Sequence, residues 1–342
     1  LPLAHAYGCA FDFLSPLAVG GHVTLLGKIP SPKILIEAMQ MVKPTVICCV
    51  PLILEKIYRK QVLPLLEKGP MSIAMKIPLL NSAIYSAIRK KLIDSFGGEV
   101  VIFIVGGAPM NQETEAFLLK IKFPITVGYG MTECAPLISF TTDDLFKAGS
   151  CGMYIKEYLD LRIDSPDPEH TAGEIIVKGE HVMLGYYKDP EATAAVIDKD
   201  GWFHTGDLGY TDGPYIYITG RKKNVIITRN GKNVFPEELE YYLGKSTLVA
   251  ESMVWASQDD AGQDAVIVAT IKPDMEEVEA EIGKEAAKDP QKVEALLWSM
   301  VDKVNENLPL FKKIRQINVR KEDFEKTTGK KIKRFVESNK KQ

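Results

Sequence analysis

A short glycine-rich stretch, VGYGMTECAP at residues 127–136, offers residue types that could bind a nucleotide. Gly128 and Gly130 flank Tyr129, whose ring could stack on a base, and glycine lets a ligand approach the backbone closely. Thr132 and Glu133 supply oxygen atoms suited to phosphate or Mg²⁺. A Gly-x-Gly turn by itself is more often a plain strand-to-helix turn. This stretch therefore predicts a binding site only if other stretches of the sequence point to the same site.

A second glycine turn follows another apolar run. The stretch IVGGAP at residues 104–109 places Gly106, Gly107 and Ala108 directly after a segment of strand length. In open α/β sheets, ligands bind beyond the carboxyl ends of the strands. Two such turns therefore predict one shared ligand cleft at the edge of a sheet.

Two further side chains have the chemistry to hold the sugar and phosphate of a nucleotide. Asp207, in GWFHTGDLGY at residues 201–210, could accept hydrogen bonds from both hydroxyls of a diol. Arg221, in ITGRKKNVIIT at residues 218–228, could bind phosphate or carboxylate through two N–H groups. The alternatives are a plain turn for Asp207 and, for Arg221, a surface ion pair contributing less than ~1 kcal/mol.

The basic stretch FEKTTGKKIKRF at residues 324–335 carries Lys330 and Lys331 side by side. A basic run of this kind is usually a solvated surface. The alternative is that one of the two lysines reaches a reacting anion, and the residues alone leave this choice open.

One more motif-like stretch, GEIIVKGEHVMLGYY at residues 173–187, is expected to form strand and turn scaffold without chemistry. His181 within it and His204 further along are expected to be structural, since catalytic roles are rare among scattered histidines.

The elements that would hold these residues alternate in the first half of the chain. Apolar runs in PTVICCVP, EVVIFIVGGAP and PITVGYG alternate with helical segments, as in a mostly parallel sheet covered by helices. After Gly149, short strands separated by Gly, Asp and Pro predict a largely antiparallel, β-rich subdomain. From Pro236 onward, a helix, paired strands, two helices in residues 275–307 and a last strand predict a compact α+β unit.

The composition is that of an ordinary globular protein. The chain has 342 residues and a formal net charge of −3, which gives no general attraction to nucleic acid or to an anionic membrane. Five cysteines without a Cys-x-x-Cys pair predict free thiols and a reducing, cytoplasmic location. No run approaches the roughly 20 apolar residues of a membrane span, while peripheral membrane contact and the oligomeric state stay open.

Taken together, in order and spacing, these motifs resemble those of the adenylate-forming superfamily of acyl-CoA synthetases, luciferases and peptide-synthetase adenylation domains. GYGMTECAP is similar to the family's Tyr-Gly-x-Thr-Glu motif, HTGD to its ribose-binding motif, and LPLAHAYG to its segment near the acyl pocket. GRKKNVIITRNGKNVFPEELE resembles its hinge and the segment that follows. Within the family, TRNGKNVFPEELE and the tail TTGKKIKR most resemble long-chain fatty acid–CoA ligases.

The resemblance implies a fold of two parts. Residues 1–220 would be the C-terminal part of a large AMP-binding domain, residues 221–223 a hinge, and residues 224–342 a small α+β lid domain. The family's Ser/Thr/Gly-rich phosphate loop, which precedes the LPLAHAYG segment in relatives, is not found in the sequence. We therefore expect the chain to be a fragment of a longer enzyme, and to be weakly active or inactive by itself.

The resemblance also implies a two-step reaction. A fatty acid carboxylate attacks the α-phosphate of ATP to give acyl-AMP and pyrophosphate, and the thiol of CoA then takes the acyl group. ATP, Mg²⁺ and CoA are the expected cofactors and co-substrates, and no nucleic-acid partner is expected. Two alternatives stay open: a ligase for another acid or for an acyl-carrier protein as acceptor, and a nucleotide- or acyl-binding protein without turnover.

Matching positions suggest roles for individual residues. The two glycine turns would line the adenine site, with Tyr129 stacked on the base, Thr132 near phosphate and Glu133 holding Mg²⁺. The remaining positions are His5 in the acyl pocket, Asp207 on the ribose, Arg221 on the ribose and phosphate, and Lys223 at the hinge, where many relatives have Asp.

The family's C-terminal lysine bridges the substrate carboxylate and the α-phosphate, where a cation stabilises the charge that two anions bring to the transition state. The tail of this chain allows two choices, because the glycine of the motif stands one residue early. Three other motif positions select Lys331, whereas Gly329 selects Lys330. We expect Lys331 to be the catalytic lysine, with Lys330 as the alternative.

Overall fold

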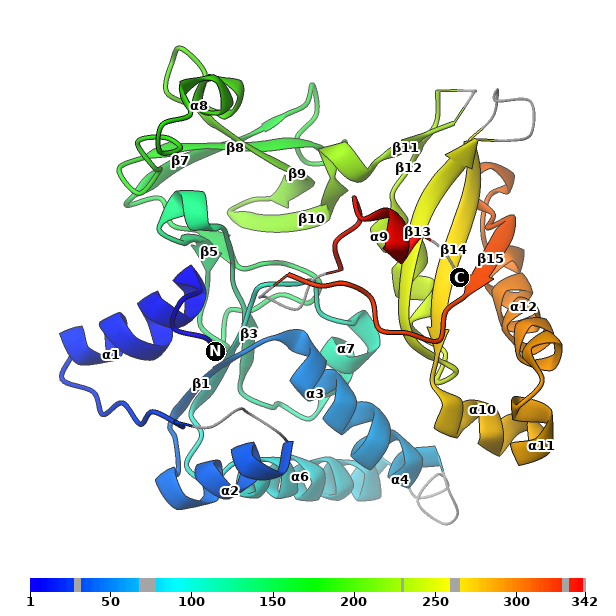
Figure 1. Cartoon of the computed structure of the whole chain (residues 1–342). Helices are drawn as coiled ribbons and strands as arrows, with labels where there is room; N and C mark the ends of the chain where they lie inside the picture. Colours follow the sequence, from blue (N-terminus) through cyan, green and yellow to red (C-terminus); the bar gives the residue numbers. More distant parts are fainter. Residues whose placement is uncertain (28–31, 68–77, 229–230, 259–264, 328–331, 341–342) are drawn as a thin grey trace. The chain divides into compact units, whose positions relative to one another are not determined.

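The computed structural model describes residues 1–27, 32–67, 78–228, 231–258, 265–327 and 332–340 (Figure 1). The chain divides into two compact units. The first unit comprises Leu1–Thr205 and Tyr210–Ile218, and the second comprises Gly206–Gly209 and Thr219–Gln342. Each unit has buried hydrophobic residues that form a core of its own.

A three-stranded parallel sheet, in the order β1 (Val46–Cys49), β2 (Ile102–Val105) and β3 (Ile125–Val127), forms one part of the first unit. Cys49 lies opposite Val105, and Val105 lies opposite Val127. The carboxyl ends of the three strands therefore meet at one edge of the sheet, as predicted from the three apolar runs.

Helical segments precede, connect and flank these strands. They are η1 (Gly8–Leu14), α1 (Ser15–Ala18), α2 (Pro32–Val42), α3 (Pro51–Ile57), η2 (Tyr58–Val62), α4 (Leu63–Glu67), α6 (Pro78–Ser95) and α7 (Gln112–Lys120). Proline begins α3, where its missing N–H and fixed φ suit the first turn. Asn111 caps α7, because its side chain accepts hydrogen bonds from the N–H groups of Glu113 and Thr114.

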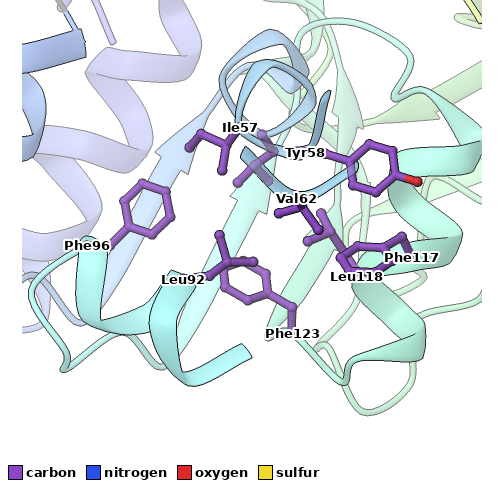
Figure 2. A pocket seen from close by; sticks show the side chains of 9 residues that line it. Ile57, Tyr58, Val62, Leu92, Phe96, Phe117, Leu118 and Phe123 are labelled. Atoms are coloured by element: carbon purple, nitrogen blue, oxygen red, sulfur yellow. The ribbon is translucent and has the colours of Figure 1, made fainter. Parts of the chain in front are cut away.

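The helices beside this sheet enclose a small apolar cavity (Figure 2). Its volume is about 10 Å³, and no charged side chain lines it. A void of this size without polar partners is a local gap in packing and offers no room for a substrate. The lining side chains are Leu54, Ile57, Tyr58, Val62, Leu92, Phe96, Phe117, Leu118 and Phe123.

A seven-stranded sheet forms the β-rich part that follows, in the order β4–β5–β6–β10–β9–β8–β7. Its strands are β4 (Tyr129–Gly130), β5 (Leu137–Phe140), β6 (Met153–Tyr154), β7 (Leu159–Asp164), β8 (Gly173–Gly179), β9 (Phe203–Asp212) and β10 (Tyr215–Arg221). The pairs β4–β5, β5–β6, β6–β10 and β7–β8 are antiparallel, in agreement with the prediction for this region. Helix α8 (Pro190–Val196) lies between β8 and β9 in the sequence.

The second unit contains a three-stranded sheet of β13 (Val249–Gln258), β14 (Ala265–Pro273) and β15 (Gln316–Val319). β13 pairs antiparallel with β14, and β15 pairs parallel with β14. Its helices are α9 (Pro236–Leu243), α10 (Met275–Ile282), α11 (Lys284–Ala287) and α12 (Pro290–Glu306), drawn from chartreuse to orange in Figure 1. Leu239 and Leu243 of α9 and Leu297 of α12 are fully buried in the core that these elements share.

Residues 275–306 form three helices, whereas the sequence pattern predicts two. The break between α10 and α11 falls at Gly283, which has a φ of +84°. A residue in this region of φ cannot continue a right-handed helix, and glycine adopts it without steric penalty. Apart from this difference, the mixed parallel and antiparallel α/β architecture agrees with the predicted fold class.

Candidate functional site

The two predicted glycine turns lie side by side at the carboxyl ends of β2 and β3. The Gly106 N–H donates a hydrogen bond to the carbonyl of Cys49 (3.1 Å), and the Gly128 N–H donates to the carbonyl of Val105 (2.9 Å). The parallel ladder thus continues one residue past each strand. Both turns reach the edge at which open α/β sheets bind ligands.

Tyr7 covers one side of the first turn. Its hydroxyl donates to the carbonyl of Ile104 (2.8 Å). A Cβ atom built at Gly106 would lie 3.2 Å from the Tyr7 ring and 3.5 Å from the carbonyl oxygen of Gly128. Gly107 has a φ of +85°, which favours glycine, and the neighbouring Ala108 is half-buried.

The loop after β3 folds back tightly onto itself. A Cβ atom at Gly130 would lie 1.8 Å from the carbonyl oxygen of Pro136, so no other residue fits there. Tyr129 is only 8% exposed and packs in the hydrophobic core of the β-rich part. Thr132 begins the short helix η3 (Thr132–Cys134) and is exposed to solvent.

Glu133 is held from two sides by a segment about 50 residues further along the chain. The Tyr186 hydroxyl donates to Oε1 of Glu133 (2.9 Å), and the Met183 N–H donates to its backbone carbonyl (2.8 Å). The sequence pattern predicts only scaffold for this segment and does not single out Tyr186. The available signal was the Gly-Tyr pair that closes the GEIIVKGEHVMLGYY motif.

In the second unit, Asp207 and Arg221 form an ion pair. Nε of Arg221 lies 3.0 Å from Oδ1 of Asp207. Asp207 is 4% exposed, whereas the Arg221 side chain is 43% exposed. The arginine thus fixes the buried carboxylate while keeping part of its own N–H groups accessible to an anion.

The predicted hinge, residues 221–223, begins at the last residue of β10 and continues into the short helix η4 (Lys222–Asn224), where Lys223 is exposed. The Asn224 amide donates to Oε1 of Glu237 (2.7 Å), which ties the end of this segment to α9. A Cβ atom at Gly220 would lie 3.0 Å from the Phe235 ring. The backbone just before the hinge therefore passes close to the start of α9.

Lys330 and Lys331 lie outside the described residues. The described residues on either side of them are joined to each other, because Lys326 and Ile332 form an isolated antiparallel bridge. The Lys326 ammonium also pairs with the carboxylate of Glu251 on β13. The segment that leads up to the two lysines is thus tied to the sheet of the second unit.

Arg334 ties the segment that follows the two lysines to the same unit. Its guanidinium donates to the carbonyl of Val254 (3.0 Å) and pairs with the carboxylate of Glu240 on α9. The Val254 N–H in turn donates to Oε1 of Glu240 (2.6 Å). Burial raises the pKa of Glu240 above its ordinary value, and the charge of Arg334 opposes that rise.

The histidines differ in their surroundings. Nδ1 of His5 accepts a hydrogen bond from the Tyr7 N–H (3.2 Å). Nδ1 of His204 lies 3.0 Å from Oε2 of the buried Glu174. Both ring nitrogens of His181 are buried without a hydrogen-bond partner in the described part of the chain, and burial lowers its pKa.

The family model described as AMP-binding enzyme matches residues 1–187, more than half of the chain. The chain belongs to the AMP-binding enzyme family. The match ends at the Gly-Tyr motif, so it includes both glycine turns, Glu133 and Tyr186.

Curated relatives of this family member are CoA ligases and synthetases. It is 31% identical to "Long chain acyl-CoA synthetase 6, peroxisomal" of Arabidopsis thaliana, over 80% of this chain and 42% of that protein. It is 32% identical to a 4-coumarate–CoA ligase of Vanilla planifolia, over 65% of this chain and 42% of that protein. The chain therefore spans about two fifths of the length of these relatives.

Two solved structures share the fold of this chain. The o-succinylbenzoate CoA synthetase MenE of Bacillus subtilis, in complex with the acyl-adenylate OSB-AMP, matches with a TM-score of 0.72 at 23% identity, over 98% of this chain and 58% of that one. ATP-bound MatB of Rhodopseudomonas palustris matches with a TM-score of 0.71 at 25% identity, over 96% of this chain and 57% of that one.

Two kinds of feature are absent from the described residues. No helix among them is both long and apolar enough to cross a membrane. Nor do they contain a group of three or more His, Cys, Asp or Glu side chains arranged to hold a metal ion. A metal that takes only one protein carboxylate, as Mg²⁺ with a nucleotide does, needs no such group.

Proposed function

We propose that the whole protein is an AMP-forming acid–thiol ligase. It joins a carboxylic acid to the α-phosphate of ATP with release of pyrophosphate, and it then transfers the acyl group from AMP to the sulfur of CoA. The observation that carries the proposal is the family match over residues 1–187, which includes two adjacent glycine turns at one sheet edge. Solved relatives are named as complexes with an acyl-adenylate and with ATP, and these names support the same reaction class.

Residues of the first unit bind the base, a phosphate and the divalent cation in this proposal. Gly106, Gly107 and Ala108 line the adenine, Gly128 and Gly130 let the ligand approach, and Tyr129 stacks on the base. Thr132 contacts a phosphate, and Glu133 holds the divalent cation. The donor set fits Mg²⁺, which prefers oxygen ligands and is usually bound through one or two carboxylates together with substrate phosphates. When bound, Mg²⁺ neutralises phosphate charge.

The remaining roles in this proposal belong to residues of the second unit. Asp207 accepts the ribose hydroxyls, and Arg221 contacts the ribose and phosphate. Lys331, or Lys330 in the alternative alignment, stabilises the combined charge of the two anions that react in the first step. In this proposal residues 1–220 belong to the large domain, residues 221–223 with Lys223 form the hinge, and residues 224–342 form the lid.

We propose a long-chain fatty acid as the substrate, with His5 in the acyl pocket. The tail motif TTGKKIKR and the segment TRNGKNVFPEELE favour this class. A relative of similar identity is named as a 4-coumarate–CoA ligase, which favours an aromatic acid as the second candidate. An acyl-carrier protein as acceptor and a binding role without turnover are less favoured candidates. A cytoplasmic location stays a prediction. One relative is named as peroxisomal, which makes the peroxisome the alternative location.

Product analysis with the whole protein that contains these 342 residues tests the proposal. Palmitate, 4-coumarate and o-succinylbenzoate are each incubated with ATP, Mg²⁺ and CoA, and the thioester, AMP and pyrophosphate are measured. We expect palmitoyl-CoA together with equal amounts of AMP and pyrophosphate. ADP in place of AMP, or no thioester from any acid, would contradict the reaction class, and a preference for 4-coumarate would contradict only the choice of acid.

A further inference from the structure

Tyr186 and Glu133 belong to different motifs, yet they meet in the first unit. The Tyr186 hydroxyl donates to Oε1 of Glu133 at 2.9 Å. The Met183 N–H donates to the backbone carbonyl of Glu133 at 2.8 Å, so the same segment holds both the side chain and the backbone of this residue. Within the part of the chain that the structure describes, Oε2 of Glu133 accepts no hydrogen bond from another residue.

Tyr186 is itself fixed by the residues around it. Its N–H donates to Oγ1 of Thr193 (2.9 Å), and that hydroxyl donates to the carbonyl of Asp189 (2.8 Å). Asp189 caps α8 through the Ala192 N–H (2.9 Å). Gly185, with a φ of +148°, approaches Thr193 so closely that a Cβ there would lie 2.8 Å from its Cγ2 atom. The start of α8 thus sets the position of the Tyr186 backbone.

The Tyr186 hydroxyl is the donor in this contact, because an ionised carboxylate can only accept hydrogen bonds. A neutral hydroxyl adds no charge that would compete with a cation for the carboxylate. It occupies one oxygen and restricts rotation of the group, so the other oxygen keeps a fixed direction.

We infer that Tyr186 is a positioning residue, whose hydroxyl orients the Glu133 carboxylate toward the divalent cation of the nucleotide. The inference rests on the proposed function, in which Glu133 holds that cation. Partners that orient a ligating carboxylate typically change metal affinity or activity by 10–100-fold when they are removed.

A purely structural role for the hydrogen bond is the alternative. In that case Tyr186 would only tie the loop before α8 to the Tyr-Gly-x-Thr-Glu loop, and its loss would lower stability without changing how the cation binds. A positioning role predicts that loss of the hydroxyl weakens metal binding, whereas a structural role predicts unchanged metal binding. Metal affinity measured without turnover therefore separates the two roles.

The test uses Tyr186→Phe in the whole protein, which removes the hydroxyl and keeps the ring. The matched control is Tyr187→Phe, since Tyr187 is the next residue and is 88% exposed. Binding of Mn²⁺ in the presence of ATP, without acid or CoA, is followed by electron paramagnetic resonance. The thermal midpoint of each variant is recorded, and Glu133→Gln alone and with Tyr186→Phe completes a double-mutant cycle.

We expect Tyr186→Phe to weaken Mn²⁺ binding by about 10–100-fold and Tyr187→Phe to change it by less than about twofold. In the Glu133→Gln background, Tyr186→Phe should have no further effect, because the carboxylate that it orients is absent. Wild-type Mn²⁺ affinity in Tyr186→Phe would overturn the inference, as would a lowered thermal midpoint with unchanged affinity. Equal affinity in wild type and Glu133→Gln would instead overturn the metal role in the proposed function, and the inference with it.

Discussion

Glycine at position 130 is required by the fold itself, whatever the loop binds. Any side chain there would collide with the carbonyl of Pro136, at 1.8 Å from the first added atom. At Gly106 the nearest atoms belong to the Tyr7 ring, 3.2 Å away, so the restriction is milder. A glycine in a motif can therefore be required by the fold, by the ligand or by both. The space around its Cα atom in the structure shows whether the fold requires it.

The Asp207–Arg221 pair leads to a prediction about nucleotide binding. Asp207→Asn removes the charge that would accept the ribose hydroxyls, and hydrogen bonds to charged groups contribute about 1.5–3 kcal/mol. We expect the KM for ATP to rise by about 10–100-fold in the adenylation step, measured by pyrophosphate exchange. The control is Asp212→Asn on the same strand, whose exposed carboxylate pairs with Lys147 at 3.1 Å. A similar effect of both variants would contradict the assignment.

Glu115 gives a prediction about pH and stability. It is 3% exposed, and burial raises its pKa to about 7, although the Gly149 N–H opposes this by donating to it. An acid whose folded pKa is raised takes up protons on folding, so its contribution is full below about pH 4.5 and is lost as the pH rises through about 7. This difference in pKa between the folded and unfolded states corresponds to roughly 3 kcal/mol of stability.

We therefore expect the free energy of unfolding to fall less in Glu115→Gln than in wild type when the pH is raised from 5 to 8. Urea unfolding of both proteins at the two pH values measures the difference, and the comparison cancels the effects of other titrating groups. Parallel losses in wild type and variant would show that Glu115 is ionised in the folded protein at pH 5.

At the scale of elements, the second unit anchors the tail on both sides of Lys330 and Lys331. Lys326 pairs with Glu251 on β13, and Arg334 pairs with Glu240 on α9. The buried Asn339 adds to this by donating to the carbonyls of Glu325 and Lys333 at 3.0 Å each. The predicted catalytic lysine is thus flanked by segments that are fixed to a folded core.

Arg334→Ala should affect the two half-reactions differently. Loss of the anchor displaces the segment after the lysine, so adenylation should fall about tenfold or more. Thioester formation from preformed acyl-AMP and CoA should be largely retained, because the proposed role of the lysine is confined to the first step. Rapid-quench assays of each half-reaction measure this, with Lys321→Ala as an exposed control. Equal losses in both half-reactions would point to general unfolding of the second unit.

At the scale of the whole molecule, the sequence predicted elements that depend on adjacent residues better than it predicted contacts between distant residues. The apolar runs located β1, β2 and β3, and Pro236 marked the start of α9, because these signals lie in adjacent residues. The contact between Tyr186 and Glu133 was missed, because it joins residues that are 53 positions apart and depends on how the loop before α8 folds. The third helix in residues 275–306 was missed because a single glycine can either be tolerated in a helix or end it.

We propose that the whole protein activates an acid through an acyl-adenylate with the help of one tail lysine. Acid-dependent exchange of pyrophosphate into ATP, measured with palmitate and Mg²⁺ in the whole protein, tests it most directly. We predict exchange in wild type, a loss of about a hundredfold in Lys331→Ala, equivalent to ~3 kcal/mol, and near wild-type exchange in Lys330→Ala. Exchange that does not depend on an acid, or that survives in Lys331→Ala and Lys330→Ala alike, would contradict the account.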